Sequence, residues 1–467
     1  MCAMLFFATT VNYMDRQVLS LTFKEFIQPE FHWTDSDYGT ITGVFSIAYA
    51  IFCLFAGKFI DWMGTKKGYL IAIVVWSLGA VMHAGCGWVT EQVVGVADKV
   101  ALLNATGAIV SSISMVSVWL FLACRLILGL GEAGNFPAAI KVTAEYFPKK
   151  DRAFATALFN AGASVGALAA PATIPLLAKS LGWEWAFIII GALGFLWAGI
   201  WIFVYDKPEE SKHVNEAELE YIHQDEKEQS AVSNQPSEEK QMSFAEAFKH
   251  KQTWSFAFGK FMTDGVWWFF LFWAPAYFQD QFGIKASDPQ GIALIFTLYA
   301  IVTVVSLFGG YLPKIFVEKK GMEPYAGRMR AMLIFAFFPI LALFAQPLGG
   351  IYGPWAVAII IGIVGAAHQS WSANIFSTTG DMFPKSAVAT ITGIGAMAGG
   401  VGSFLINKGS GMLFDHAAQL GEAFKFAGFT GKPAAYMIVF CICAVAYLIG
   451  WSVMKILVPK YKPVVVK

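Results

Sequence analysis

The sequence predicts an all-α protein that crosses a membrane with twelve transmembrane helices in two six-helix halves. Hydrophobic residues make up 57% of the 467 residues and charged residues only 14%, whereas a soluble protein carries roughly 25% charge. Apolar stretches of about 20 residues, the length that crosses a bilayer, recur along the chain. One long polar segment separates six of these stretches from the other six.

The predicted spans are joined by short connections in most places. In chain order they are 2–24, 38–60, 69–89, 116–140, 153–178, 184–205, 253–279, 290–316, 329–346, 353–378, 386–407 and 433–457. The first contains Asp15 and Arg16, which the apolar core of a cleavable signal peptide would not tolerate, so we expect no such peptide. Residues 90–115 form a long and moderately apolar connection, for which we expect an outer hairpin or an interfacial helix.

These spans divide the chain into four regions. They are an N-terminal half (1–206), a linker (207–250), a C-terminal half (251–458) and a tail (459–467). The linker is strongly polar, which predicts a solvated loop with a short surface helix. Lys and Arg gather in alternate short connections, for example at Lys66 and Lys149. Because such loops stay on the cytoplasmic side, we expect both termini and the linker to be cytoplasmic.

Composition and motifs argue against several function classes. The formal net charge is +1, so the chain shows no excess of basic residues that would indicate nucleic-acid binding. The six cysteines lie in apolar stretches and lack the spacing of a metal site or a disulfide framework. The sequence has no Walker motif and no dinucleotide-binding fingerprint. We therefore expect no cofactor, no metal, no ATP-driven step and no enzymatic activity.

A glycine-containing motif lies between the second and third spans. The segment AGKFIDWMGTKK carries Gly57, Asp61, Gly64 and Lys66. The glycines permit a close helix approach and a tight turn, and Asp61 can accept hydrogen bonds from a helix end or a basic residue. An ordinary charged turn is the alternative. The spacing resembles the loop motif of the major facilitator superfamily, which implies conformational gating rather than substrate contact.

Four ionisable residues fall inside predicted spans, where charge is costly and usually functional. They are Asp15 and Arg16 in the first span, and Arg125 and Glu132 in the fourth. Seven residues make nearly two helical turns, so the last two share a face about 10 Å apart. The arginines suit an anionic substrate, because a guanidinium binds a carboxylate through two parallel hydrogen bonds. The two acids suit the binding and release of a proton, because an apolar environment can raise the pKa of a carboxylate toward neutrality. A purely structural ion-pair network is the alternative.

The tenth span contributes a polar face. His368, Gln369, Trp371 and Asn374 lie in AAHQSWSANIF, and three-residue spacing puts the first, third and fourth of them on one side of a helix. A sugar needs hydrogen-bonding groups and a stacking surface, and this face offers both. Hydrogen bonding between helices within the bundle is the alternative.

Other polar positions are weaker candidates. Lys260 and Asp264, four apart in the seventh span, are either an intrahelical ion pair or a gate. We interpret the adjacent Trp267–Trp268 pair as a lipid or interface anchor. Asn12 and Asn160 are further polar candidates in the first and fifth spans.

Longer stretches resemble the anion:cation symporter family of the major facilitator superfamily, and within it the bacterial hexuronate transporters most. They are YMDRQVLS, CRLILGLGEAGNFPAAIKV, GWEWAFIIIGALGFL and IIGIVGAAHQSWSANIF. The resemblance covers nearly the whole chain apart from 90–115. It implies a site near the middle of the membrane, between the halves. It also implies a multi-pass protein of the bacterial inner membrane that acts as a monomer.

The resemblance also implies roles for single residues. Asp15 and Glu132 match acids implicated in proton coupling. Arg16 matches the basic residue that meets the substrate carboxylate, and Arg125 matches its basic partner. Tyr49 matches a binding tyrosine of the second span.

The predicted function is uptake of a sugar acid, by resemblance a hexuronate such as galacturonate or glucuronate, through proton symport with alternating access. The expected partners are a small organic anion, a coupling proton and the lipid bilayer. Ala163 and Ala396 stand where related galactonate transporters have Gln and Asn, so the sugar acid stays open. The alternatives are an exchanger or sodium-coupled carrier of another organic anion, and a non-transporting membrane sensor.

Overall fold

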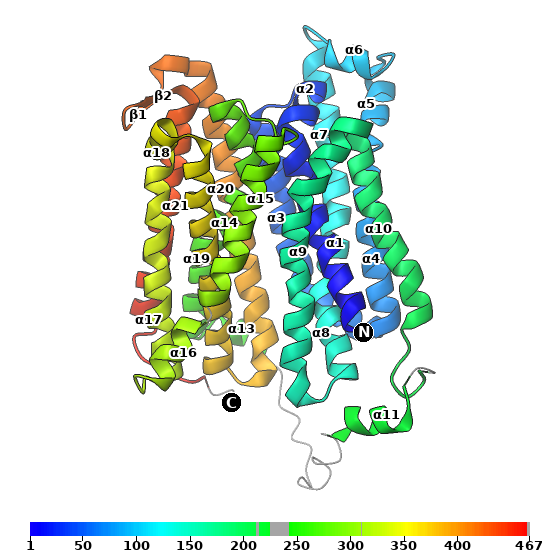
Figure 1. Ribbon diagram of the computed structural model, residues 1–467, viewed down its shortest axis with the longest axis vertical. Coiled ribbons are helices and arrows are strands. Elements are labelled where there is room, and N and C mark those ends of the chain that lie inside the picture. Colours follow the sequence, from blue (N-terminus) through cyan, green and yellow to red (C-terminus); the bar gives the residue numbers. More distant parts are fainter. Residues whose placement is uncertain (212–213, 225–241, 310, 465–467) are drawn as a thin grey trace.

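The computed structural model describes residues 1–211, 214–224, 242–309 and 311–464, and it consists of long helices with one short hairpin (Figure 1). The rest of the predicted linker and the last residues of the tail lie outside the described residues. Both termini lie at one end of the molecule, which we call the termini end. The opposite end, where α2, α6 and the β-hairpin lie, is the far end.

A first group of helices precedes the linker. It comprises α1 (Cys2–Thr22), the π-helical turn η1 (Phe23–Ile27), α2 (Gln28–Phe31), α3 (Asp35–Met63), α4 (Thr65–His83), α5 (Cys86–Val94), α6 (Lys99–Leu103), α7 (Ile109–Glu132), α8 (Asn135–Tyr146), α9 (Lys149–Leu181) and α10 (Trp183–Val204). The linker contributes α11 (Glu216–Ile222) and α13 (Phe244–Ala247). The expected short helix of the linker is therefore present.

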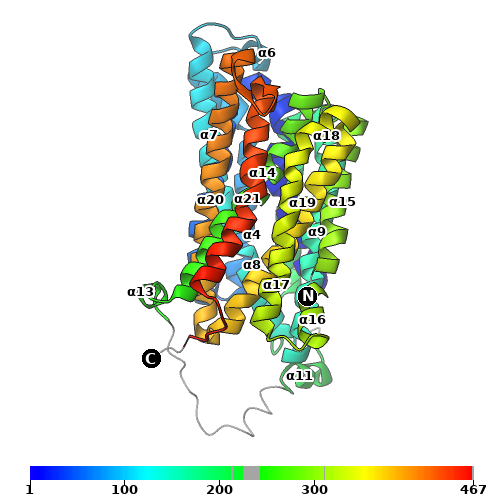
Figure 2. The same ribbon diagram turned by 90° about the vertical axis from the view of Figure 1, so that its left-hand side faces the viewer.

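A second group follows the linker. It comprises α14 (Lys251–Phe282), α15 (Pro289–Gly309), α16 (Tyr311–Glu318), α17 (Pro324–Phe337), the 3₁₀ helix η2 (Phe338–Phe344), α18 (Ala345–Tyr352), α19 (Pro354–Met382), α20 (Lys385–Leu420), η3 (Gly421–Ala423), β1 (Lys425–Phe426), β2 (Phe429–Thr430) and α21 (Gly431–Leu457). The two strands pair antiparallel as a single hairpin. The long helices of both groups run between the two ends (Figure 2).

The predicted spans fall on long helices or on helices joined end to end. Among the described residues, ten such segments are long and apolar enough to cross a membrane. α1 and α14 are outside that set, and each carries charged residues within its length. α3 begins three residues before the predicted 38–60 and ends three residues after it. The all-α fold class is confirmed.

Local sequence explains where the helices begin and turn. Thr34 and Asp37 form a capping box at the start of α3. Gly64 makes the turn into α4, and its positive φ of 77° is a backbone conformation that favours glycine. Phe-Pro precedes both α9 and α20, and the two prolines, Pro148 and Pro384, have nearly the same backbone angles. The same local signature therefore recurs at corresponding places in the two groups.

The connection at 90–115 folds as α5, a turn and α6. Lys99 Nζ lies 3.0 Å from Glu30 and 2.5 Å from Glu184, so it ties α6 to α2 and α10. The Trp183 indole also donates to Glu30 at 2.7 Å. Burial raises the pKa of the Glu30 carboxyl, and the nearby Lys99 offsets only part of that effect. The short helix α6 is thus anchored at the far end.

The two groups meet along α3 and α20. A Cβ atom on Gly39 would lie 2.4 Å from the backbone oxygen of Asn407, and one on Gly43 would lie 3.1 Å from Phe404. On the other side, a Cβ on Gly400 would lie 2.4 Å from Ala50. Small residues let helix backbones approach closely inside a membrane. Glycines therefore fix this contact between the groups.

Candidate functional site

Arg16 lies in the middle of α1, at the junction of the two groups of helices. Its Nε donates to Glu132 Oε2 of α7 at 2.7 Å, and these side chains are only 8% and 0% exposed. The guanidinium lies 4.5 Å from the ring centre of Tyr49 on α3 and 5.7 Å from that of Trp268 on α14. A single buried cation thus contacts both groups.

Arg125 and Asp15 are buried beside this pair without partners of their own. None of the three guanidinium nitrogens of Arg125 has a hydrogen-bond partner among the described residues, and neither does either carboxylate oxygen of Asp15. The guanidinium of Arg125 lies 5.3 Å from the ring centre of Phe45. Buried charges without partners are expensive. A purely structural network would have paired them, so this arrangement favours a functional site.

Further polar atoms around these charges are buried without partners among the described residues. They belong to Asn12, Arg16 (Nη2), Gln17 (Oε1), Trp76 (Nε1), Ser77, His83 (Nε2), Glu132 (Oε1) and Asn135 (Nδ2). All of them lie on α1, α4, α7 and α8. The interior of the first group therefore offers donors and acceptors that a polar ligand or protons could use. Asn12 belongs to this set, whereas Asn160 is exposed on α9.

The polar face of α19 is engaged within the second group. His368 Nδ1 lies 2.7 Å from the Tyr447 hydroxyl of α21, and its ring stacks on Trp267 of α14 at 5.5 Å. The Nδ2 of Asn374 donates to the backbone oxygen of Ser370 at 2.8 Å. The His368–Tyr447 contact is an example of the expected alternative, hydrogen bonding between helices, whereas the Asn374 contact stays within α19.

Trp371 and Gln369, also on α19, are less fully engaged than His368 and Asn374. Trp371 is fully buried, and its indole N–H has no partner among the described residues. Gln369 is half-buried. The recorded partners of this face lie on α14, α19 and α21, so within the described contacts it does not meet Arg16.

The interpretation of Trp267 and Trp268 as a lipid or interface anchor is wrong. Trp267 stacks on His368 with the ring planes 2° apart, and Trp268 faces the guanidinium of Arg16. Neighbouring residues on a helix point about 100° apart, so the pair serves both groups at once. The proximity of Lys260 and Asp264 on the same helix was the signal that could have indicated an interior position.

The residues of the predicted gating motif lie at the termini end. Asp61 accepts from Lys141 of α8 at 2.7 Å, as expected for a basic partner, and Lys66 donates to Asp206 at 2.7 Å. Gly64 makes the turn. The close helix approach expected at Gly57 is not seen, because a Cβ there would meet no atom within 4 Å.

A cluster of four charges that the sequence did not indicate joins the two groups at the far end. We call Lys24, Asp35, Asp280 and Lys432 the far-end cluster. Lys24 lies 3.0 Å from Asp35 and 3.1 Å from Asp280, and Lys432 lies 2.5 Å and 2.7 Å from the same two carboxylates. Each lysine therefore bridges an aspartate of the first group and one of the second.

Other polar contacts extend this junction at the start of α3. The carboxylate of Asp415, on α20, accepts from the backbone N–H groups of Asp35 and Ser36 at 2.9 and 2.7 Å. A negative charge at a helix N-terminus is stabilising. Lys408 of α20 also donates to Ser36 and Thr40. A carboxylate and a lysine of the second group therefore hold the first turn of α3.

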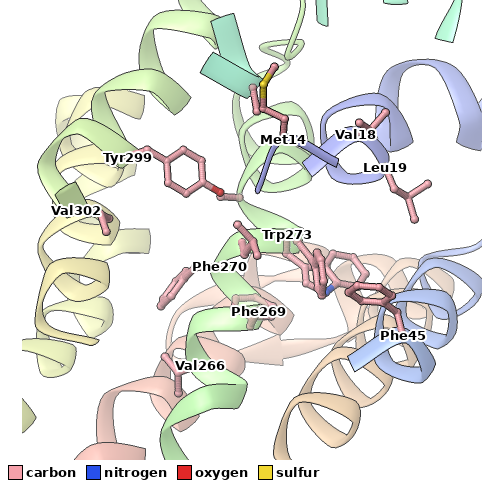
Figure 3. Packing of buried hydrophobic residues seen from close by; sticks show 14 of the residues in the cluster. Met14, Val18, Leu19, Phe45, Val266, Phe269, Phe270, Trp273, Tyr299 and Val302 are labelled. Carbon is pink, nitrogen blue, oxygen red and sulfur yellow. The ribbon is translucent and has the colours of Figure 1, made fainter. Parts of the chain in front are cut away.

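An aromatic layer lies on the inner side of this junction. The Tyr38 hydroxyl of α3 donates to the backbone oxygen of Phe272 at 2.7 Å, and its ring meets Trp273 edge-on at 4.9 Å. Figure 3 shows the buried residues around this part of α14: Met14, Val18, Leu19, Phe45, Val266, Phe269, Phe270, Trp273, Tyr299 and Val302. α1, α3 and α15 contribute side chains beside those of α14.

The termini end lacks a comparable junction within the described residues. Among the described residues, the ion pairs near it do not join the two groups; examples are Lys66–Asp206, Lys141–Asp61 and Arg328–Asp381. Among the described residues, the ion pairs that join the two groups are therefore gathered at the far end. In the part of the chain that the structure describes, no cluster of His, Cys, Asp and Glu is suited to a metal ion.

Residues 5–406 of this chain match the Major Facilitator Superfamily as a family. The hexuronate transporter of Escherichia coli K12 is 28% identical over 417 residues, which cover 89% of this chain and 87% of that protein. The D-galactonate transporter of Escherichia coli O6:H1 is 27% identical over 319 residues, which cover 68% of this chain and 67% of that protein.

Solved structures show the same fold at low identity. A bacterial homologue of the human lysosomal transporter Spinster, solved in an inward-facing and unoccupied conformation, has a TM-score of 0.68 at 18% identity and covers 98% of this chain and 96% of its own. A D-xylose-proton symporter has a TM-score of 0.67 at 15% identity, and the match covers 99% of this chain and 97% of that protein.

Proposed function

Because the chain belongs to the Major Facilitator Superfamily and is a secondary transporter related to sugar-acid transporters, we propose that it takes up a hexuronate, such as galacturonate or glucuronate, by proton symport. The protein is a multi-pass membrane protein with bacterial relatives, and it is not an enzyme. The proposed location is the inner membrane of a bacterium, with both termini in the cytoplasm.

The observation that carries the proposal is the Arg16–Glu132 pair at the junction of the two groups. Glu132 holds the cation through one carboxylate oxygen at 2.7 Å, while its other oxygen has no partner among the described residues. A proton on Glu132 would weaken that hold and free the planar fork of Arg16 for a substrate carboxylate. The proton and the substrate anion then enter together and carry no net charge.

Neighbouring side chains fit the rest of a sugar acid. Tyr49 and Trp268 both place aromatic rings near the Arg16 guanidinium, and sugar rings pack well against such rings. Arg125 and Asp15 supply a second base and a second acid within the first group. In this proposal Gln369, Trp371, Asn374 and His368 recognise the hydroxyl groups from the side of α19.

Alternating access follows from where the groups are joined. We infer that 1–206 and 251–458 move against each other as two halves, with 207–250 as a cytoplasmic linker, 459–467 as a tail and one chain as the working unit. In this proposal the far-end cluster closes the periplasmic side, and its ion pairs join the two groups there. The described residues of the termini end form no ion pair between the groups. The motif with Gly57, Asp61, Gly64 and Lys66 would close the cytoplasmic side in turn.

Uptake into proteoliposomes tests this function. Purified protein should accumulate labelled galacturonate or glucuronate when the lumen is alkaline relative to the outside, and an uncoupler should abolish accumulation. Asp15→Asn should remove the pH-driven part and spare some counterflow.

The same vesicles separate the alternatives. Accumulation that needs a sodium gradient, or an internal anion, would replace proton symport by sodium coupling or exchange. Binding of the sugar acid without any uptake would favour a membrane sensor and overturn the proposal.

A further inference from the structure

A second buried ion pair lies within α14. Lys260 Nζ is 2.7 Å from Asp264 Oδ2, and these side chains are 6% and 13% exposed. The ammonium also lies 4.3 Å from the ring centre of Phe376 on α19. The other carboxylate oxygen of Asp264 is buried and has no partner among the described residues.

This pair repeats the features of the Arg16–Glu132 pair in the opposite group. Each cation contacts its acid at 2.7 Å and lies over an aromatic ring, at 4.5 Å for Arg16 and 4.3 Å for Lys260. Each acid keeps one buried oxygen without a partner among the described residues. The two groups thus each contain a cation that is held by an incompletely satisfied acid.

Packing against α20 makes room for the Asp264 carboxylate. A Cβ atom on Gly399 would lie 2.2 Å from Asp264 Oδ2, so only glycine leaves space there. An ion pair that served only to stabilise the bundle could be replaced by apolar residues without loss. A buried pair with an unsatisfied oxygen, in a helix that faces the other group, is better explained by a ligand.

The position of the pair places it on the substrate's way to the termini end. α14 begins at that end, and Lys260 precedes Trp268 by eight residues, which is about 12 Å along a helix. Trp268 in turn faces Arg16. An anion that leaves Arg16 toward the termini end therefore passes the level of Lys260.

We propose that Lys260 and Asp264 form a second anion site, at which the substrate carboxylate pairs with Lys260 after a proton binds to Asp264. The inference rests on the proposed transport of a sugar acid. The proton comes from solution and neutralises the Asp264 carboxylate. Lys260 keeps its charge throughout and exchanges one carboxylate partner for another.

Few titratable groups face this pair from the elements packed against it. His368 of α19 interacts electrostatically with Lys260, and Tyr447 of α21 interacts electrostatically with Asp264. α20 presents Gly399 at the contact. His368 and Tyr447 are hydrogen-bonded to each other at 2.7 Å, whereas Asp264 has a buried oxygen without a partner among the described residues. The proposal therefore assigns the change of charge to Asp264.

Sided transport measurements test the proposal. In vesicles of known orientation, Lys260→Gln should raise the KM for galacturonate at least tenfold from the termini side and change it less than twofold from the far side. Lys260→Arg, which keeps the charge, should restore most of the termini-side affinity. Asp264→Asn should keep that affinity and lose its dependence on pH. Lys314→Gln is the matched control, because Lys314 and Glu318 form an exposed pair with the same spacing on α16.

The outcomes separate this proposal from the function on which it rests. A wild-type protein that accumulates no sugar acid would refute both. Normal wild-type uptake, with Lys260→Gln changing KM equally from both sides or not at all, would refute only the second site. If Lys260→Gln does not fold, Asp264→Asn with a wild-type pH profile would refute it equally.

Discussion

Removing Lys432 alone should open the far end more than removing Lys432 and Asp280 together. The far-end cluster has two positive and two negative charges in mutual contact, so its net charge is zero. Lys432→Met leaves three charges that sum to −1. The side chains that remain are only 5–12% exposed, which keeps water from compensating the excess charge.

The magnitude follows from burial. Breaking a fully buried pair costs about 3–5 kcal/mol, whereas an exposed pair contributes about 0–1 kcal/mol. The Lys432 side chain is 20% exposed and lies between these limits. We therefore expect Lys432→Met to shift the balance between a closed and an open far end by about 1–3 kcal/mol, or about 5- to 150-fold. Adding Asp280→Asn leaves the neutral Lys24–Asp35 pair, and most of the shift should disappear.

Distances between spin labels measure this balance directly. Labels at Ser112 on α7 and Ala418 on α20 occupy exposed positions in the two groups near the far end, after replacement of the six cysteines. Double electron–electron resonance should show a longer distance population in Lys432→Met and its decrease in the double variant. Lys425→Met, at an exposed position on β1, is the control. An unchanged distribution in Lys432→Met, or equal opening in the double variant, would refute the reasoning.

Four further predictions follow from the contacts described. Arg16→Lys keeps the charge but loses the planar fork, so the Kd for the sugar acid should rise at least tenfold in a binding titration; an unchanged Kd would move the anion to Arg125. Glu132→Gln imitates the protonated acid and should abolish pH-driven accumulation while counterflow persists; wild-type accumulation would contradict the coupling role. Gln369→Ala should flatten the preference between galacturonate and glucuronate, since an unpaired buried group costs about 1–3 kcal/mol; a uniform loss of rate would mean that the side chain only packs. Burial raises the pKa of Glu30 above its unfolded value, so its stabilising neutral form is lost as pH rises through the folded pKa. Glu30→Gln should therefore raise the Tm at neutral pH and leave it unchanged near pH 4 (below the ordinary pKa of a Glu, about 4.3); parallel pH profiles of Tm would refute this.

Apolar length and polar breaks were enough to predict the helices. Each predicted span falls on a long helix or on helices joined end to end. Membrane thickness fixes the length of a span, and an apolar stretch of that length is visible in the composition. The exact ends were less predictable. They depend on local devices such as the capping box at Thr34 and the turn at Gly64.

The partners of the buried charges were not predictable from spacing. The sequence placed Asp15, Arg16, Arg125 and Glu132 inside spans, but two acids and two bases allow more than one pairing. Only the crossing of α1 and α7 decides that Arg16 meets Glu132 and that the other two have no partner among the described residues. The proton-coupling and binding roles of these residues stay predictions.

The far-end cluster was missed for a related reason. Its members are separated by up to 408 positions, and each lies at the end of a predicted span, where an isolated charge is ordinary. Lys24 and Asp35 flank the first connection, while Asp280 and Lys432 flank connections of the second group. Nothing local distinguishes them from solvated charges. Their meeting depends on the way α3 and α14 are brought together at the far end.

The helix α14 takes part in three of the buried charged features described above. α14 contributes Asp280 to the far-end cluster, Trp268 to the surroundings of Arg16, and Lys260 with Asp264 to the second buried pair. Twenty residues separate Asp280 from Lys260, which is about 30 Å along a helix, or the thickness of the apolar part of a bilayer. A shift of α14 relative to α1 would therefore change the far-end cluster and the Arg16 site together. This gives a physical reason why substrate at Arg16 and closure at the far end should be coupled, since both change the same helix contact.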